Sequence, residues 1–124
     1  EAIKRPIAQG LWDSLLESLS LIKSFSCPTV VRITCIKGMN MSEGHVGEFS
    51  KLLREAEPTY IEAKAYMHVG FSTRRLRRSS MPRFGDVRVF SEKLASEIGY
   101  RIIDEDADSR VGLLSKLKKT KRFA

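Results

Sequence analysis

Cysteine is scarce in this chain, and its scarcity excludes several classes of protein. The 124 residues hold only Cys27 and Cys35. Two cysteines are too few for the disulfide framework of a small secreted domain, and their spacing fits no zinc or iron–sulfur motif. We therefore predict no metal ligands in this sequence and a location in the reducing cytoplasm.

Long hydrophobic runs are also missing. No stretch approaches the roughly 18–20 apolar residues of a membrane-spanning helix, and the opening residues, EAIKRPIAQG, do not resemble a signal peptide. Hydrophobic residues make up 42% of the chain and charged residues 30%, which is typical of soluble globular proteins. We predict no membrane partner and one compact domain over residues 1–115, followed by a basic tail over 116–124.

Familiar catalytic motifs are absent as well. The sequence contains no nucleophile elbow, Walker loop, GxGxxG or HExxH pattern. Composition and spacing alone therefore predict no particular reaction.

Positive charge is plentiful but unevenly distributed. Residues 1–59 carry seven basic and seven acidic side chains, whereas residues 60–124 carry fifteen basic and eight acidic ones, so the second part holds the whole net charge of +7. Segregated positive charge points to a polyanion such as nucleic acid, and a solubilising surface is the alternative. For the arginine-rich loop the forked guanidinium groups favour phosphate contacts, while for the tail both interpretations remain open. The two clusters are Arg74, Arg75, Arg77, Arg78, Arg83 and Arg88 in the loop region, and Lys116, Lys118, Lys119, Lys121 and Arg122 in the tail.

Hydrophobic periodicity predicts three helices and four strands. Ser42 is a suitable N-cap for the second helix, Pro82 can open the third, and Gly99 suits its C-cap. Apolar stripes at helical spacing predict helices over 11–24, 43–56 and 82–98. Alternating or β-branched segments predict strands over 29–36, 59–67, 100–104 and 110–114.

The alternation of helix and strand predicts parallel strands with helices packed on their outer side. Only one face of the predicted strands is apolar, whereas a central strand of an open doubly wound sheet is usually apolar on both faces. A polar second face fits the interior of a barrel. We therefore predict an α/β fold in which about three βα units and a short terminal strand form a partial (β/α) barrel.

Ionisable side chains follow the polar face of two predicted strands and mark the candidate site. A cavity at the carboxyl ends of these strands is one interpretation, and an exposed ion pair between Glu62 and Lys64 is the alternative. Asn40, just after the first strand, either binds a ligand or caps the turn. The residues on the polar face are Arg32, Thr34, Glu62, Lys64, Tyr66 and His68.

Four segments carry a resemblance to a known family. They read RPIAQGLWDSLLESLSLI, TVVRITCIKGMNM, PTYIEAKAYMHVGFSTRRLRRSSMP and SEIGYRIIDEDADSRVGLL. Together they resemble the C-terminal part of the radical S-adenosylmethionine enzymes that build the wyosine base of tRNA, the 4-demethylwyosine synthase family. The similarity runs from about Arg5 to Leu114, and the strands RITCIKGMN and IEAKAYMHVGFS are its most specific parts.

The resemblance implies a function for the full-length family member. It implies a partial (β/α) barrel that binds S-adenosylmethionine and 4Fe-4S clusters, one of them on a CxxxCxxC loop. It also implies a reaction in wybutosine biosynthesis, in which pyruvate is condensed with N1-methylguanosine beside the anticodon of tRNA-Phe. The expected class is a radical lyase, with tRNA-Phe and pyruvate as partners.

The sequence departs from the family where the clusters bind. CxxxCxxC is absent, and Cys27 and Cys35 do not replace it. We therefore expect this chain to be the C-terminal half of the barrel, to require the N-terminal half of the same enzyme, and to bind no cluster and show no turnover alone. A non-catalytic basic α/β module that binds RNA is the alternative.

The resemblance also implies roles for matching residues. Arg32, Thr34, Lys37 and Asn40 correspond to interior residues near the adenosyl ligand. Glu62, Lys64, Tyr66 and His68 correspond to a wall that faces the substrate base or pyruvate. Ser72, Arg74, Arg75, Arg77 and Arg78 correspond to a loop at the barrel mouth that meets the tRNA backbone.

Overall fold

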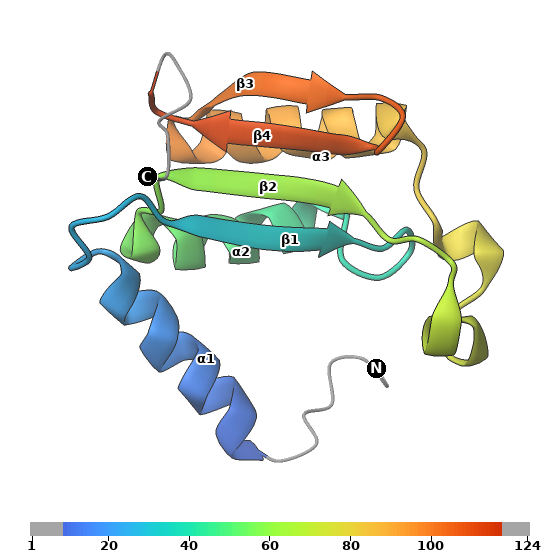
Figure 1. Cartoon of the computed structure of the whole chain (residues 1–124), viewed down its shortest axis with the longest axis horizontal. Coiled ribbons are helices and arrows are strands. Elements are labelled where there is room, and N and C mark those ends of the chain that lie inside the picture. The colour runs from blue at the N-terminus through green and yellow to red at the C-terminus, as the bar shows by residue number, and fades with distance from the viewer. Residues whose placement is uncertain (1–8, 118–124) are drawn as a thin grey trace.

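The computed structural model describes residues 9–117 (Figure 1). Each predicted helix and strand is present, and the helix expected over 43–56 has those same bounds. The other elements differ from the prediction only at their ends, and the third strand runs on into the expected turn. The elements are α1 (Gln9–Ile22), β1 (Val30–Cys35), α2 (Glu43–Ala56), β2 (Tyr60–Ala65), the short 3-10 helices η1 (Gly70–Arg74) and η2 (Arg78–Ser80), α3 (Phe84–Ile98), β3 (Arg101–Asp106) and β4 (Val111–Ser115).

The four strands form one mixed sheet in the order β1-β2-β4-β3. β1 and β2 pair in parallel, as predicted. The expected parallel arrangement does not extend to the short terminal strand β4, which runs antiparallel to both of its neighbours and lies between β2 and β3. The strand after the third helix therefore does not pair with β2, although it points the same way.

The connection between β3 and β4 explains this insertion. Only four residues separate the two strands, which is too short for the crossover that a parallel partner needs. The Asp106 carboxylate accepts hydrogen bonds from the backbone N–H groups of Asp108 and Ser109 at 3.0 and 3.2 Å. Arg110 then adopts a left-handed conformation with φ of 52°. This tight turn sends β4 back beside β3 as a hairpin.

Local signals at the helix ends work as the sequence predicts. The Ser42 side chain accepts a hydrogen bond from the backbone N–H of His45 and caps α2. Gly99 ends α3 at φ of 75°, a conformation that costs glycine little. α3 begins at Phe84 rather than at Pro82, because the Arg83 N–H is held by the Asp86 carboxylate at 2.9 Å in the N-cap position.

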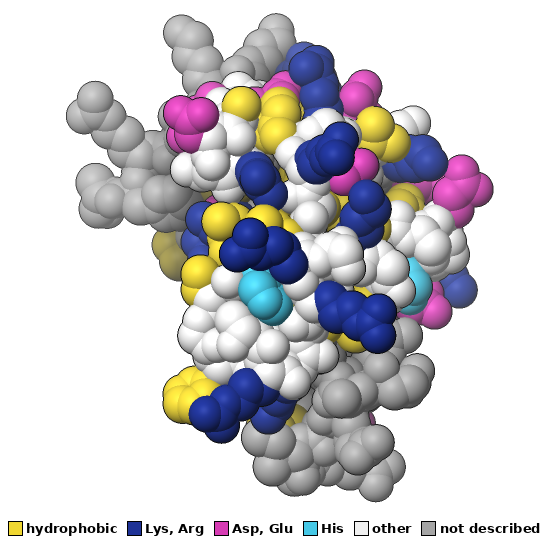
Figure 2. Space-filling model, turned by 90° about the vertical axis from the view of Figure 1, so that its right-hand side faces the viewer, with side chains coloured by type: hydrophobic (Ala, Val, Ile, Leu, Met, Phe, Trp, Pro, Cys, Tyr) yellow, Lys and Arg dark blue, Asp and Glu magenta, His cyan; other side chains and the backbone are white. Residues whose placement is uncertain are grey.

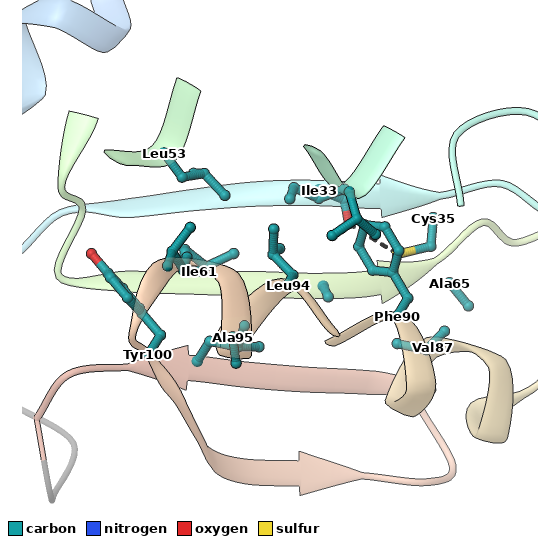
Figure 3. Packing of buried hydrophobic residues seen from close by; sticks show 14 residues of the cluster. Ile33, Cys35, Leu53, Ile61, Ala65, Val87, Phe90, Leu94, Ala95 and Tyr100 are labelled. Atoms are coloured by element: carbon teal, nitrogen blue, oxygen red, sulfur yellow. Dashed lines mark hydrogen bonds between the residues drawn. The ribbon is translucent and has the colours of Figure 1, made fainter. Parts of the chain in front are cut away.

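α2 and α3 cover one face of the sheet, and the core lies between them and the strands (Figures 1 and 3). Alternation places Ile33 and Cys35 of β1 and Ile61 of β2 on the covered face, where each is at most 5% exposed. Phe90 and Leu94 of α3 pack onto them. Burial of these side chains supplies the main stabilisation of the fold, at about 25 cal/mol per Å² of apolar surface.

The opposite face of the sheet carries no helix within residues 9–117 (Figure 1). Arg32 and Thr34 are exposed there, and Glu62 and Lys64 are half-buried. The prediction of one apolar and one polar face is thus confirmed for β1 and β2. No helix among the described residues is long and apolar enough to cross a membrane.

Helix α3 approaches β4 closely through small residues. Gly112 of β4 faces Ser91 of α3, and a Cβ built on Gly112 would lie 3.3 Å from Ser91 Oγ. Ser91 is fully buried, and its hydroxyl is the one buried side-chain group among residues 9–117 without a hydrogen-bond partner. On folding, the hydroxyl loses its hydrogen bonds to water and gains none in the protein, which lowers the stability of the fold.

Replacing Ser91 by alanine should therefore stabilise the protein. We expect Ser91→Ala to raise the free energy of unfolding by about 1 kcal/mol, because the mutation removes an unsatisfied hydroxyl and leaves the close contact with Gly112 intact. Urea unfolding followed by circular dichroism measures the change. Ser50→Ala is the matched control, since the buried Ser50 hydroxyl donates to the Val46 carbonyl at 2.7 Å. A loss of stability in Ser91→Ala would show that the hydroxyl has a partner.

Two buried groups make stability depend on alkaline pH. Burial raises the pKa of the Cys35 thiol from 9.0 to about 12. Burial, and secondarily the Glu57 carboxylate, raises the pKa of Tyr100 from 10.0 to about 12. Tyr100 also donates a hydrogen bond to the Pro58 carbonyl, which ties the end of α3 to the start of β2. Both groups keep their protons more tightly in the folded chain than in the unfolded one.

We expect the protein to lose stability as the pH rises from 9 toward 12. The stabilisation is complete below the unfolded pKa values and decreases by at most about 1.4 kcal/mol per pH unit for each group as the pH approaches the folded values. Cys35→Ala should flatten this decrease between pH 9 and 10, whereas Cys27→Ala, at an exposed position, should not. Urea unfolding at each pH gives the free energy of unfolding of both variants. An equal decrease of this free energy with pH in Cys35→Ala and Cys27→Ala would contradict the prediction.

Candidate functional site

The carboxyl ends of β1 and β2 bring the candidate residues together at one edge of the sheet. Cys35 lies opposite Ala65, and the pairing continues one step further, since the Tyr66 N–H donates to the Cys35 carbonyl at 2.8 Å. The turn after β1 is tied to the loop after β2, because the Lys37 N–H donates to the Ser80 carbonyl at 2.8 Å. Turn and loop thus form one edge of the molecule (Figure 1).

A row of polar side chains crosses β1 and β2 on the open face. The register sets Arg32 opposite Glu62 and Thr34 opposite Lys64. Arg32 Nη2 lies 3.0 Å from Glu62 Oε1, and the Glu62 side chain is only 24% exposed. The suggested pairing of Glu62 with Lys64 is therefore wrong, because the cross-strand neighbour is closer than the neighbour along the strand. No ion pair within residues 9–117 involves Lys64.

The turn after β1 is held by Asn40. Its Oδ1 accepts from the Ile36 N–H at 2.8 Å, and its Nδ2 donates to the Thr34 carbonyl at 2.8 Å. Of the two interpretations of Asn40, capping of the turn is the one that the structure shows. Lys37 remains largely exposed, with its ammonium 3.9 Å from the Asp86 carboxylate. A weak contact of this kind leaves the ammonium available to an anionic ligand.

Tyr66, His68 and Ser72 form a chain of hydrogen bonds where β2 ends. The Ser72 hydroxyl donates to the Val69 carbonyl, so it must accept from the Tyr66 hydroxyl, 2.9 Å away. The single hydroxyl proton of Tyr66 is then used. The 2.9 Å contact between the Tyr66 hydroxyl and His68 Nδ1 therefore needs a proton on Nδ1. This arrangement leaves His68 Nε2 as the ring nitrogen that can meet a ligand.

The basic loop after β2 is anchored at both ends. The Ser72 hydrogen bonds hold its start, and Arg110 Nη1 holds its end by donating to the Pro82 carbonyl at 3.0 Å. Between these anchors, four exposed arginines make no ion pair with any residue in 9–117. Figure 2, which views this edge, shows basic side chains spread over it, with the carboxylates mainly in its upper part and on its right-hand side. The four are Arg74, Arg75, Arg77 and Arg78.

One arginine of the predicted cluster belongs elsewhere. Arg88 lies on α3 and forms ion pairs with Glu92 at 3.8 Å and Glu105 at 3.9 Å. Its charge is thus partly neutralised within the fold. The cluster of arginines in the structure is therefore smaller than the predicted one, and it is confined to the loop between β2 and α3.

An acidic depression on the open face was not predicted. A shallow pocket of about 370 Å³ lies over β2, β4 and β3. Antiparallel pairing brings Leu113 opposite both Glu62 and Asp104, so carboxylates from two strands meet there. The spacing of Asp104 and Asp106 places both carboxylates on one face of a strand, which was a signal for an acidic surface. The strand that pairs beside them could not be predicted from the sequence. The pocket is lined by Glu62, Asp104, Glu105, Asp106, Val111 and Leu113.

The cysteines do not fit an iron–sulfur cluster. Cys35 is fully buried, and burial raises the pKa of its thiol to about 12, which opposes the thiolate that a cluster requires. Cys27 is exposed but precedes β1, at the opposite end of the strand from the candidate site. Within residues 9–117 no group of three histidine, cysteine or acidic residues could hold a metal ion.

Comparison with known sequences identifies close relatives. The chain is 39% identical to the S-adenosyl-L-methionine-dependent tRNA 4-demethylwyosine synthase of Pyrococcus horikoshii over 116 residues. The matched residues cover 93% of this chain and 33% of that protein. The chain is 36% identical over 124 residues to the enzyme of the same description from Oryza sativa subsp. japonica, covering 98% of this chain and 19% of that protein. The chain thus spans about a third of the archaeal relative's length.

Solved structures share the fold. A structure of TYW1 with a lysine-pyruvate adduct bound superposes with a TM-score of 0.77 at 30% sequence identity, over 94% of this chain and 36% of that one. A crystal structure of archaeal TYW1 gives a TM-score of 0.70 at 27% identity, over 88% of this chain and 33% of that one. The fold of this chain is therefore similar to that of the solved TYW1 structures.

A family sequence model described as "Wyosine base formation" matches residues 55–116. The match runs from the end of α2 through β2, the basic loop, α3 and the β3–β4 hairpin. It includes the Tyr66–His68–Ser72 chain and the four exposed arginines. Since these residues make up half of the sequence, the chain belongs to the wyosine base formation family.

Proposed function

We propose that this chain is the C-terminal part of a 4-demethylwyosine synthase that condenses pyruvate with N1-methylguanosine in tRNA-Phe. The observation that carries the proposal is the similarity to synthases of that description along 93% of the chain, together with a family match over residues 55–116 that includes β2 and the basic loop. In this proposal the enzyme is a cytoplasmic radical lyase. The N-terminal half completes the barrel over the open face of the sheet.

The basic loop binds the tRNA backbone. Four exposed guanidinium groups without carboxylate partners in the described residues match phosphate oxygens in charge and geometry. The loop is anchored through Ser72 and Arg110, so little ordering is needed when RNA arrives. Contacts with the backbone position the RNA, and they leave the choice of base to the residues deeper in the site.

The open face of β1 and β2 contributes one wall of the reaction chamber. S-adenosylmethionine supplies an adenosyl group and an amino-acid end, and the exposed Thr34 hydroxyl and Lys37 ammonium suit these polar groups. Arg32 is already neutralised by Glu62, and Asn40 shapes the turn. The cysteines for the 4Fe-4S clusters come from the N-terminal half, because those of this chain do not fit.

Tyr66 and Ser72 orient His68 toward the substrate side of the edge. Nδ1 is held by the Tyr66 hydroxyl, so Nε2 can accept a hydrogen bond from the base or bind the carboxylate of pyruvate when protonated. Glu62 and Lys64 complete the wall. A lysine-pyruvate adduct is described for a related structure, and Lys64, which has no ion pair among residues 9–117, lies on the wall that would face such a group.

Neutralising two loop arginines should weaken tRNA binding. We expect Arg75→Gln with Arg77→Gln to reduce the affinity of the chain for tRNA-Phe and to make the salt slope of log K shallower by about 1.8, since each phosphate contact contributes about 0.9. Fluorescence anisotropy at several salt concentrations measures both. Lys51→Gln with Arg101→Gln removes the same charge from exposed positions outside the loop. If both pairs behave alike, the loop is not the RNA interface.

Breaking the hydrogen-bond chain should slow turnover in the complete enzyme. We expect Tyr66→Phe to lower kcat about 5- to 100-fold, because His68 loses the partner that fixes its ring, while tRNA affinity stays the same. Steady-state assays with saturating tRNA-Phe that carries N1-methylguanosine, pyruvate and S-adenosylmethionine measure kcat. Phe49→Leu, a change in the helix layer, is the control for general packing. No turnover by the unmodified complete enzyme would reject the proposed function, and a non-catalytic RNA-binding module would remain.

A further inference from the structure

Phe71 is the most exposed large hydrophobic residue among those described. Its side chain is 81% exposed, well above the other large apolar side chains at the surface. Val69 and Met67, just before it, are 66% and 42% exposed. A phenyl ring held in water loses the stabilisation that burial would give. An apolar patch of this kind at a functional edge indicates a surface that is covered by a partner.

The backbone around Phe71 is fixed although the ring is exposed. Gly70 takes φ of 62°, which lets the chain turn sharply away from β2 at little conformational cost. The Thr73 hydroxyl donates to the Gly70 carbonyl at 2.8 Å, and Ser72 is bound to Tyr66. Phe71 thus sits between two anchored residues at the start of η1. The ring is displayed on a rigid support, not on a loose loop.

The charges around Phe71 define the chemistry of its partner. The Arg74 guanidinium lies over the ring, with Cζ 5.7 Å from the ring centroid. Arg75, Arg77 and Arg78 follow within the same loop and make no ion pair with residues 9–117. An apolar protein surface would have to desolvate these cations without compensation. A partner that combines flat π-faces with negative charge matches both features, which is the composition of single-stranded nucleic acid.

We infer that Phe71, backed by Arg74, is a stacking platform for one unpaired base of the RNA substrate. This inference rests on the proposed function and deepens it by naming a base contact in a loop otherwise suited to phosphates. The open face of the ring stacks on the base, and the neighbouring arginines hold the phosphates on either side. A base can reach the ring only where the RNA is single-stranded, so the platform selects a loop over a duplex.

The test compares Phe71 variants of the 124-residue chain on two RNA probes. The first probe is a fluorescein-labelled hairpin with an open loop, and the second is a fully paired duplex of the same length. We expect Phe71→Ala to weaken hairpin binding roughly 5- to 150-fold and to leave duplex binding unchanged. Phe71→Trp should bind the hairpin at least as well as the unmodified chain. Because Phe71 is exposed, none of these variants should alter the fold.

Salt dependence separates stacking from phosphate contact. Phe71→Ala should lower hairpin affinity by the same factor at every salt concentration, because stacking releases no counterion. The loop arginine variants should change the slope itself. Phe25→Ala is the matched control, since Phe25 is also an exposed phenylalanine, at 55%, and lies before β1 outside the loop.

Each result decides the inference. Equal hairpin affinity in Phe71→Ala and the unmodified chain would overturn the platform and leave the proposed function standing. Full affinity in Phe71→Leu would also overturn it, because a leucine offers apolar contact without a π-face. If the chain binds phosphatidylserine-containing vesicles but not RNA, and Phe71→Ala weakens that binding, the patch around Phe71 is a membrane-binding surface instead. Absence of RNA binding by the unmodified chain would overturn the platform and the proposed RNA contact of the basic loop, whereas turnover by the complete enzyme tests the proposed function separately.

Discussion

The parallel pairing of β1 with β2 is the constraint on which the rest of the structure depends. Its register sets Arg32 beside Glu62 and Thr34 beside Lys64. A slip of one residue would turn every side chain of one strand to the other face, so a buried residue such as Ile61 would meet water. The core against α2 and α3 therefore fixes the register, and the register in turn fixes the polar row. The same pairing brings the turn after β1 and the basic loop to one edge.

Tight packing on the covered face keeps this edge rigid. β1 and β2 present Cys35, Ala63 and Ala65 to the helices, and these small side chains let α2 and α3 come close. Gly112 does the same on β4, where Ser91 of α3 lies over it. A close helix layer holds the strand ends, and the strand ends hold the anchors of the loop. Rigidity at the site thus depends on small residues on the covered face, some of them directly before the site at the ends of β1 and β2.

Sequence alone could predict the elements of this fold but not all of their pairing. The strict alternation in 59–67 and the capping residue Ser42 are local signals, so β2 and α2 were predicted well. The place of β4 was not, because it depends on the hairpin turn and on a partner strand that is distant in sequence. The Arg32 partner of Glu62 is a contact of the same kind, whereas the link from Tyr66 to Ser72 is close in sequence and depends on how the loop after β2 folds back. Periodicity tells which face a side chain takes, whereas its neighbour depends on strand order.

Strand order also gathers carboxylates on the open face of the sheet, apart from the arginines of the basic loop. The β3–β4 hairpin gathers Glu62, Asp104 and Asp106 around one depression, while the exposed arginines lie beyond the carboxyl end of β2. Phosphates are repelled by the first region and attracted by the second, over a screening length of about 8 Å. Under the proposed function, an RNA backbone would therefore follow the loop and stay off the sheet. For the RNA substrate of the proposed function, this arrangement favours a neutral base over a phosphate at the carboxylates of the open face, so the base can enter while the backbone stays on the loop.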